Sequence, residues 1–394
     1  MPELTKSTRD LIVCCEGEGH RVRLRGGVRF ISRARCPKCA APVDPRRWRR
    51  VACFLTNLAR PATDHPLDRA TWVAAALVFA GTVVGVLSFR AGADLWWPAT
   101  VMLFGPRWVV LLPVLPVVLL ATIRDRALLV PLTVVLLSLL GPLLGFRTGI
   151  RGLFVMERES DLVVATLNAQ SGRAFTYGLA PLMDLLGADV LMVQECGGAL
   201  RDSIRRTTEW HTASNSTLCV VSRFPITERS VMDRANLRSV GGSALIATYS
   251  LDTGGADIHV TNVHLETPRD GLELIRSGQV SEGVEILRQK SILREIELRR
   301  AERWAREGHH PALVVGDFNT PPESRHFRRI WSSWTDAFGR AGFGIGGTRL
   351  NGWIRARIDY VMADDSWTVV SARTGEPVGS DHLPVVARLR LRAR

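Results

Sequence analysis

Residues 313–322, in the C-terminal part of the chain, read LVVGDFNTPP. An apolar run ends at Gly316, Asp317 and Asn319 then flank Phe318, and two prolines follow. Gly, Asp, Asn and Pro are the usual turn formers, so an ordinary turn after a buried strand fits. Because alternate strand residues point to the same side, a metal and phosphate site at the strand's end fits as well. These ten residues alone do not decide between the two interpretations.

The sequence around this stretch alternates short β-rich apolar runs with helical segments. The predicted strands are residues 162–168, 190–195, 218–222, 243–250, 256–265, 312–318, 357–362 and 384–391. The predicted helices are residues 175–187, 199–207 and 279–307. In the last of these helices, an apolar stripe is expected from Val284, Leu287, Ile292, Ile296 and Trp304. Strands interspersed with helices predict a layered α/β domain over residues 160–394.

Polar residues interrupt these strands, mostly where a strand ends. They are Asn168, Glu195, His264, Asp317, Asn319, Asp359, Asp381 and His382. Each alone has an ordinary explanation, such as a turn residue, a satisfied core histidine or the partner of an arginine. A carboxylate that closes an apolar strand, as Glu195 does, needs a partner. The recurrence of such positions in one domain favours a common site.

The chemistry of this set is that of a metal-assisted hydrolase. Carboxylate and amide oxygens suit Mg²⁺ or Mn²⁺, which binds one or two carboxylates together with substrate phosphate. Two histidines supply acid and base groups. The sequence contains neither a Gly-x-x-x-x-Gly-Lys-Ser/Thr loop nor a Gly-x-Ser-x-Gly motif. These observations favour metal-assisted hydrolysis of a phosphate ester.

The polar positions also lie in ordered motifs that resemble a known family. The motifs are LN (167–168), QE (194–195), TNVH (261–264), GDFN (316–319), RIDYV (357–361) and SDHLPV (380–385). Together with SRFPI (222–226), they resemble the endonuclease/exonuclease/phosphatase superfamily, which has the DNase I-like fold. The segment HLETPRDGLE (264–273) is similar to that of membrane-anchored bacterial members. The resemblance implies a four-layer α/β/β/α sandwich with an active site on one edge.

The resemblance also implies a role for each residue. The metal, Mg²⁺ or Mn²⁺, is expected at Glu195, with Asn168 and Asp381 beside it. Asp317 and Asn319 are expected to hold the attacking water and the phosphate oxygens. His382 is expected to act as general base, oriented by Asp359. His264 is expected to contact the phosphate or to protonate the leaving group.

Three apolar runs precede this domain and predict a transmembrane region over residues 70–147. The expected spans are residues 71–89, 106–123 and 127–146, each near the length that crosses a ~30 Å hydrocarbon core. Arginines cluster before the first span and between the second and third. By the positive-inside rule, the N-terminal tail is cytoplasmic and three spans place the catalytic domain outside a multi-pass cell or inner membrane. An extra half-span around residues 95–106 would reverse the side of the catalytic domain.

The basic tail, residues 1–69, contains cysteines spaced as in a zinc site. Cys36 and Cys39 form a C-x-x-C pair, and Cys15 with His20 or Cys14 can complete a tetrahedral structural Zn²⁺ site within about residues 14–39. Unligated reduced thiols are the alternative. The remaining cysteines, Cys53, Cys196 and Cys219, are expected to be small buried residues without a disulfide.

The distribution of charge bears on the substrate. The chain has 51 Lys+Arg and 38 Asp+Glu, a net charge of +13. The first 70 residues hold 15 of these basic residues against 7 acidic ones, whereas residues 151–394 hold 31 against 29. A nearly neutral domain disfavours nucleic acid, whose binding needs clustered basic charge. A membrane lipid or lipid-linked phosphate is the expected substrate, a tethered nuclease is the alternative, and a non-catalytic binder of lipid-linked phosphates is a third.

Overall fold

The computed structural model describes residues 11–14, 21–24, 40, 66–150, 152–159, 161–172, 178–308, 311–351 and 354–392. Strands β1 (Leu11–Cys14) and β2 (Arg21–Leu24) pair antiparallel. The predicted zinc ligands Cys15, His20, Cys36 and Cys39 lie outside the described residues. The chain forms two compact units, residues 1–83 with 110–137 and residues 84–109 with 138–394.

Three helical segments are long and apolar enough to cross a membrane, as the sequence predicts. They are Pro66–Gly92, Arg107–Arg124 and Arg126–Leu143. The first is the single helix α2 (Pro66–Gly92). The second segment consists of η2 (Arg107–Leu111) and α4 (Val114–Arg124). The third consists of η3 (Arg126–Leu128), α5 (Leu129–Ser138) and the π-helical η4 (Leu139–Leu143).

The apolar helices of the first unit pack on one another and leave other apolar side chains outward. Ala75 of α2 packs with Val117 and Ala121 of α4 in a buried cluster. The outward side chains include Leu77 and Ile123, which are 67% and 70% exposed. Helices that are apolar on their outward faces too are typical of membrane spans.

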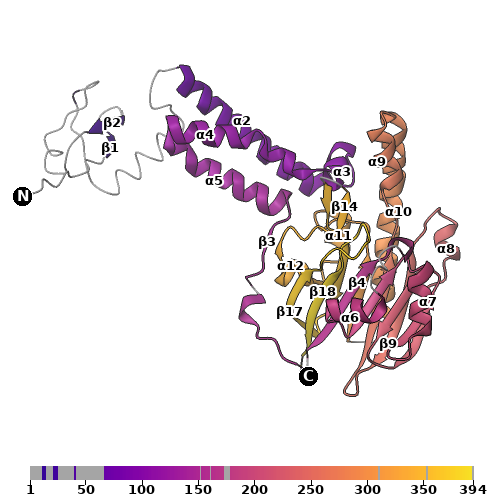
Figure 1. Ribbon diagram of the computed structural model, residues 1–394. Helices are drawn as coiled ribbons and strands as arrows, with labels where there is room; N and C mark the ends of the chain where they lie inside the picture. Colours follow the sequence, from indigo (N-terminus) through magenta and orange to yellow (C-terminus); the bar gives the residue numbers. More distant parts are fainter. Residues whose placement is uncertain are drawn as a thin grey trace, which may run out of the picture. The chain divides into compact units, whose positions relative to one another are not determined.

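Two six-stranded sheets form the centre of the second unit (Figure 1). The first has the order β12-β16-β11-β10-β9-β8, and the second β17-β18-β4-β5-β7-β6. The strands of the first are β8 (Ile226–Val231), β9 (Leu245–Asp252), β10 (Asp257–His264), β11 (Ala312–Asp317), β12 (Thr335–Asp336) and β16 (Asp359–Ala363). Those of the second are β4 (Leu162–Asn168), β5 (Val190–Gln194), β6 (His211–Asn215), β7 (Leu218–Ser222), β17 (Trp367–Thr374) and β18 (Val385–Leu391).

Short strand pairs and helices complete the unit. The pairs are β3 (Arg147–Thr148) with β13 (Phe343–Gly344), and β14 (Arg349–Asn351) with β15 (Ile354–Ala356). The helices are α3 (Trp97–Phe104), η5 (Gly152–Phe154), η6 (Gln170–Gly172), α6 (Leu179–Leu186), α7 (Gly198–Arg206), α8 (Ala235–Arg238), α9 (Arg269–Arg276), α10 (Val280–Glu307), α11 (Arg325–Ile330) and α12 (Ala337–Ala341).

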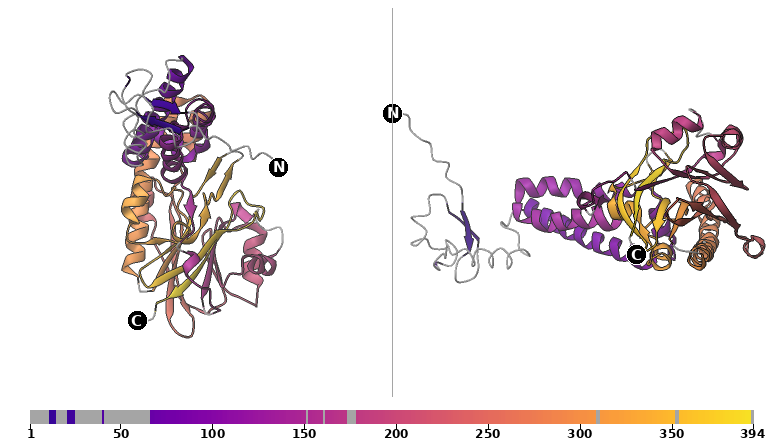
Figure 2. Two further views of the ribbon diagram at one scale, coloured as in Figure 1. Left: turned by 90° about the vertical axis from the view of Figure 1, so that its left-hand side faces the viewer. Right: turned by 90° about the horizontal axis from the view of Figure 1, so that it is seen from below.

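The sheets and helices stack as four layers, which confirms the predicted α/β/β/α sandwich (Figures 1 and 2). The two sheets enclose one apolar core, which contains Val164 of β4 and Val315 of β11. On the outer face of the second sheet, α6 and α7 cover a second core. On the outer face of the first sheet, α10 and α11 cover a third. Strands β4, β5 and β11 are buried along their whole length, which explains their nearly continuous apolar sequences.

Helix α10 forms where the sequence predicts it, and most of the expected apolar stripe packs against the protein. Ile292, expected in an apolar stripe, is 52% exposed. Leu287 is buried as expected, and Ile296 and Trp304 pack partly buried against the third core.

The buried face of α10 also contains two charged residues that the apolar pattern does not predict, Arg294 and Glu297. Glu297 accepts hydrogen bonds from the backbone N–H groups of residues 243, 244 and 266, so its buried carboxylate is satisfied. Hydrogen-bonding partners distant in sequence therefore allow a charged residue to lie on the buried face beside the apolar ones.

The prediction that Cys196 and Cys219 lack a disulfide is wrong. The two residues, 23 positions apart, form a disulfide between the end of β5 and strand β7. Both side chains are fully buried. Strands β5 and β7 are hydrogen-bonded neighbours, and this pairing, which the spacing of the two cysteines does not reveal, brings the sulfurs together.

Candidate active site

Neighbouring strands of the first sheet align three of the predicted residues. In the parallel pair of β10 and β11, His264 is the register partner of Asp317. In the antiparallel pair of β11 and β16, Asp317 is the partner of Asp359. His264 and Asp317 are also close in space, because His264 Nε2 lies 3.8 Å from Asp317 Oδ2. The sheet thus places an imidazole and two carboxylates side by side.

The second sheet contributes Asn168 and Glu195 from its parallel strands β4 and β5. Asn168 ends β4, and Glu195 follows β5 with a positive φ of 48°. Asn168 Nδ2 donates to Glu195 Oε1 at 3.2 Å and to Asp317 Oδ2 at 3.0 Å. Asn168 therefore connects two carboxylates that belong to different sheets. A non-glycine residue with positive φ costs free energy, which is typical of functional positions.

The turn after β11 explains the opening stretch of sequence. Gly316 has φ of 144°, and a Cβ there would lie 2.1 Å from the carbonyl oxygen of Val263. Only glycine allows β11 to approach β10 this closely. Asn319 has φ of 47°, and its backbone N–H donates to Asp317 Oδ1 at 2.8 Å. The turn therefore orients the Asp317 carboxylate, while the Asn319 side chain donates to the carbonyl of Leu265.

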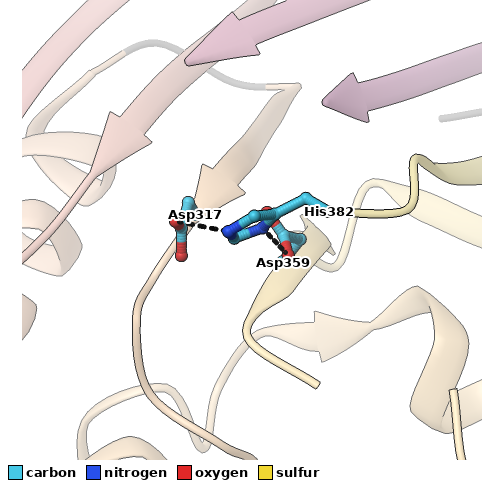
Figure 3. A group of neighbouring side chains, drawn as sticks. All are labelled: Asp317, Asp359 and His382. Carbon is cyan, nitrogen blue, oxygen red and sulfur yellow. Dashed lines mark hydrogen bonds and ion pairs between the residues drawn. The ribbon is translucent and has the colours of Figure 1, made fainter. Parts of the chain in front are cut away.

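Asp359 and His382 form a buried pair beside Asp317 (Figure 3). His382 Nδ1 lies 2.9 Å from Asp359 Oδ2, and His382 Nε2 lies 4.0 Å from Asp317 Oδ2. The His382 side chain is 2% exposed. The backbone N–H of Asp359 donates to the hydroxyl of Thr348, which fixes the start of β16. This arrangement holds the imidazole ring between two carboxylates.

The electrostatics of His382 reflect these neighbours. Burial lowers the pKa of His382, but the charges of Asp359 and Asp317 outweigh it and raise the pKa to about 9. Arg349 Nη1 lies 2.8 Å from His382 Nε2 and opposes this increase. Because a guanidinium only donates, the contact fits a ring with its proton on Nδ1 and a lone pair on Nε2. That tautomer is the one that a general base requires, whereas the raised pKa favours the protonated ring at neutral pH. The two observations disagree, and the assignment of the neutral tautomer rests on the Arg349 contact.

The carboxylates fit a divalent cation. Burial and the neighbouring Asp359 raise the pKa of Asp317, so its charged form needs a cationic partner. Asp317, Asp359 and His382 each offer a ligand atom, and these atoms lie within 4.8 Å of one another. Among the described residues, Asp359 Oδ1 and Asp381 Oδ1 are buried without a hydrogen-bond partner. This buried Asp/Asp/His group is consistent with a divalent metal site.

The assignment of individual ligands stays a prediction. Asn168, Glu195 and Asp381 are the ligands expected from the sequence, whereas the closest group contains none of them. Asp381 Oδ2 accepts from Gln170 Nε2 at 3.0 Å and pairs with Arg349 Nη2 at 2.7 Å. Asn168 and Glu195 border the same cavity as Asp317 and His382.

Four further residues of the site were not predicted from the sequence. Gln170 and Arg349 contact Asp381. Gln194 and Asn262, both fully buried, bond to each other between the sheets at 2.7 Å. Gln194 lies in the QE motif and Asn262 in the TNVH motif, so the motifs already indicated both residues. Arg349 lies in no motif, and only the fold brings it to His382.

The site opens into a cavity of about 650 Å³. Six of the eight predicted residues line it: Asn168, Glu195, His264, Asp317, Asn319 and His382. Asp359 and Asp381 do not line the cavity. Asp359 contacts His382 and Asp381 contacts Arg349, and both of these partners line it. A cavity of this size with convergent polar groups is typical of a small-molecule or substrate site.

The sequence model of the Endonuclease/Exonuclease/phosphatase family matches residues 165–382. No curated protein matches the chain. Humanized D. rerio TDP2 with 14 mutations is 15% identical, with 59% of this chain and 100% of that chain covered and a TM-score of 0.45.

Two bacterial structures are similar to a comparable degree. For an endonuclease/exonuclease/phosphatase from Beutenbergia cavernae DSM 12333, the identity is 19%, the coverage 59% of this chain and 72% of that chain, and the TM-score 0.41. For sphingomyelinase C from Streptomyces griseocarneus, the identity is 14%, the coverage 58% and 99%, and the TM-score 0.39.

Proposed function

Since the chain belongs to the Endonuclease/Exonuclease/phosphatase family, we propose that it is a membrane-anchored, Mg²⁺- or Mn²⁺-dependent phosphoesterase that hydrolyses a lipid-linked or membrane-proximal phosphate ester. One observation carries the proposal. Asn168 bonds Glu195 and Asp317, and His264 and His382 both lie within about 4 Å of Asp317. Oxygen ligands, an acid and a base therefore border one cavity.

Glu195, with Asn168 and Asp381 beside it, is the residue we expect to hold the cation, and Asp317, which Asn168 connects to Glu195, borders the same position. A bound ion would supply Lewis acidity toward the phosphoryl oxygens and offset the negative charge on them. The residues fit this purpose because the buried Asp317 carboxylate needs a positive partner. Asp381, whose Oδ1 has no hydrogen-bond partner among the described residues, is the third expected ligand.

The protein's own groups supply the proton transfers. His382 accepts a proton at Nε2 from the attacking water, and Asp359 stabilises the imidazolium that forms. The water oxygen forms a bond to phosphorus while the bond from phosphorus to the leaving oxygen breaks. His264, which is partly exposed to the cavity, donates a proton to that oxygen. A phosphate monoester thus yields an alcohol and inorganic phosphate, and a diester yields an alcohol and a phosphate monoester.

The membrane part of the proposal is supported by composition and by the disulfide. Three helical segments have the length and apolarity of membrane spans. Disulfides persist in oxidising compartments, so the bond between Cys196 and Cys219 supports a catalytic domain outside the cytoplasm. A near-neutral domain held at a membrane suits a lipid phosphoester better than a nucleic acid.

A panel of phosphoesters tests the activity. The full chain in detergent with Mg²⁺ or Mn²⁺ should hydrolyse at least one member of a panel of polyprenyl (pyro)phosphates, phospholipids, p-nitrophenyl diesters and DNA, and EDTA should abolish turnover. Asp317→Ala and Glu195→Gln should reduce kcat by about 10²-fold or more. Asp365→Asn, an exposed aspartate outside the site, is the matched control. Wild-type rates in the Asp317→Ala protein would contradict the assignment.

Two outcomes separate the alternatives. Hydrolysis of DNA without hydrolysis of any lipid phosphate would favour a membrane-tethered nuclease. A biological effect that survives Glu195→Ala would favour a binder of lipid-linked phosphates without catalysis.

A reporter fused to the C-terminus tests the topology. Three spans with a cytoplasmic N-terminus predict that alkaline phosphatase fused there is active and that green fluorescent protein is dark. The opposite pattern would place the catalytic domain in the cytoplasm.

A further inference from the structure

The cavity at the active site has two walls of different chemical character. One wall carries the polar residues of the candidate site. The other is apolar and comes from two segments distant in sequence, Val101, Phe104 and Pro106 in and after α3, and Leu272 and Ile275 of α9. Both walls border one volume of about 650 Å³, so the apolar wall is continuous with the reacting groups.

Helix α9 turns one defined face toward this cavity. Residues 269, 272, 273, 275 and 276 line it, a spacing of three and four residues that belongs to one helical face. Leu272 and Ile275 are partly exposed. On the same face, Arg269 pairs with Glu273 at 2.8 Å. The face is amphipathic, with aliphatic side chains next to charged ones.

The other apolar segment is anchored firmly to the sandwich. Asp94, just before α3, accepts hydrogen bonds at Oδ2 from Ser324 Oγ and from the backbone N–H of Arg325, at 2.9 and 2.7 Å. Its carbonyl accepts from Ser291 Oγ of α10 at 2.8 Å. Phe104 has the buried Arg294 guanidinium 5.1 Å from its ring centroid. These contacts therefore fix the α3 segment of the apolar wall to the rest of the second unit.

We propose that the apolar wall formed by α3 and α9, defined by Val101, Phe104, Pro106, Leu272 and Ile275, binds the hydrocarbon chain of an amphiphilic phosphoester. The phosphate of that substrate lies at the polar wall. This inference rests on the proposed phosphoesterase function and specifies its substrate class. Four of the five side chains of this wall are aliphatic, which suits a hydrocarbon chain, and the charged Arg269, Glu273 and Arg276 of α9 border the same cavity. The volume lies in the range of sites that enclose most of a small ligand.

A series of p-nitrophenyl alkyl phosphates tests this inference. The methyl, octyl and dodecyl diesters share the same reacting centre and leaving group and differ only in chain length. With the full chain in detergent and Mg²⁺ or Mn²⁺, kcat/KM should rise with chain length, by up to about fourfold for each methylene buried. A value independent of chain length overturns the inference and leaves the phosphoesterase function intact. No turnover of any diester by the wild type contradicts the phosphoesterase function itself.

Substitutions in the apolar wall test whether the dependence of kcat/KM on chain length arises there. Val101→Asn and Leu272→Asn should lower kcat/KM for the dodecyl diester by about tenfold or more and leave the methyl diester within about twofold. Met102→Gln and Leu274→Asn are the matched controls, because both lie on the same helices and neither lines the cavity. Equal losses for the methyl and dodecyl diesters, or equal losses in the control variants, would overturn the assignment. Thermal unfolding of each variant shows that the fold is retained.

Discussion

The hydrogen bond between Asp359 and His382 governs the protonation of the candidate base. Asp359→Asn keeps the shape of the side chain and removes its charge, so the imidazolium that forms during the reaction loses its stabilising partner. We expect kcat to fall by about 10²–10⁴-fold. Steady-state rates on a p-nitrophenyl diester measure this, with the exposed Asp365→Asn as control. Unchanged kcat would remove Asp359 from the mechanism.

Asp161 lies outside the candidate active site and forms an ion pair with Arg390. Arg390 donates to both carboxylate oxygens, at 2.7 and 2.9 Å. Burial opposes ionisation, but these bonds and the N–H of Arg158 outweigh it, and the pKa of Asp161 is lowered from 3.8. A lowered folded-state pKa stabilises the protein above pH 3.8, and this stability is lost as pH falls through the folded-state pKa.

Asp161→Asn should therefore lower Tm at neutral pH, and the difference from wild type should shrink below about pH 3.8. Thermal unfolding followed by circular dichroism at several pH values measures it. Asp202→Asn, at an exposed position of α7, should show no such dependence on pH. A Tm difference that stays constant with pH would rule out this linkage.

At the scale of elements, Asp94 anchors the segment before α3 to the start of α11. Asp94 and Arg294 are both almost fully buried, with Nη2 and Oδ1 3.8 Å apart. Asp94→Ala leaves the Arg294 charge without its partner and removes the acceptor for the α11 N–H groups. We expect a loss of about 3–5 kcal/mol in the free energy of unfolding.

The double variant tests this explanation. Arg294→Met in the Asp94→Ala background removes the uncompensated charge, so part of the lost stability should return. Denaturant unfolding of the wild type, the two single variants and the double variant gives the coupling free energy between Asp94 and Arg294. Additive losses would show that the two charges do not interact.

At the scale of the whole molecule, the disulfide ties the residue after Glu195 to the neighbouring strand. Replacing Cys196 and Cys219 together by serine should lower the free energy of unfolding by about 3 kcal/mol, as expected for closing a loop of this length. A reductant should destabilise the wild type and leave the double variant unchanged. A wild type whose free energy of unfolding does not change on addition of reductant would show that the bond does not stabilise the fold.

The sequence by itself determined the layered fold, the apolar helices and the set of polar residues. Continuous apolar strands such as 312–317 must be buried on both faces, and ordered motifs mark their ends. Only the tertiary structure decided which of these residues meet, because pairing between strands is a long-range property. The Asn168 contact with Asp317 spans 149 residues. Arg349, the disulfide and the apolar wall of α3 and α9 arise in the same way, since no local pattern encodes contacts between segments so distant in sequence.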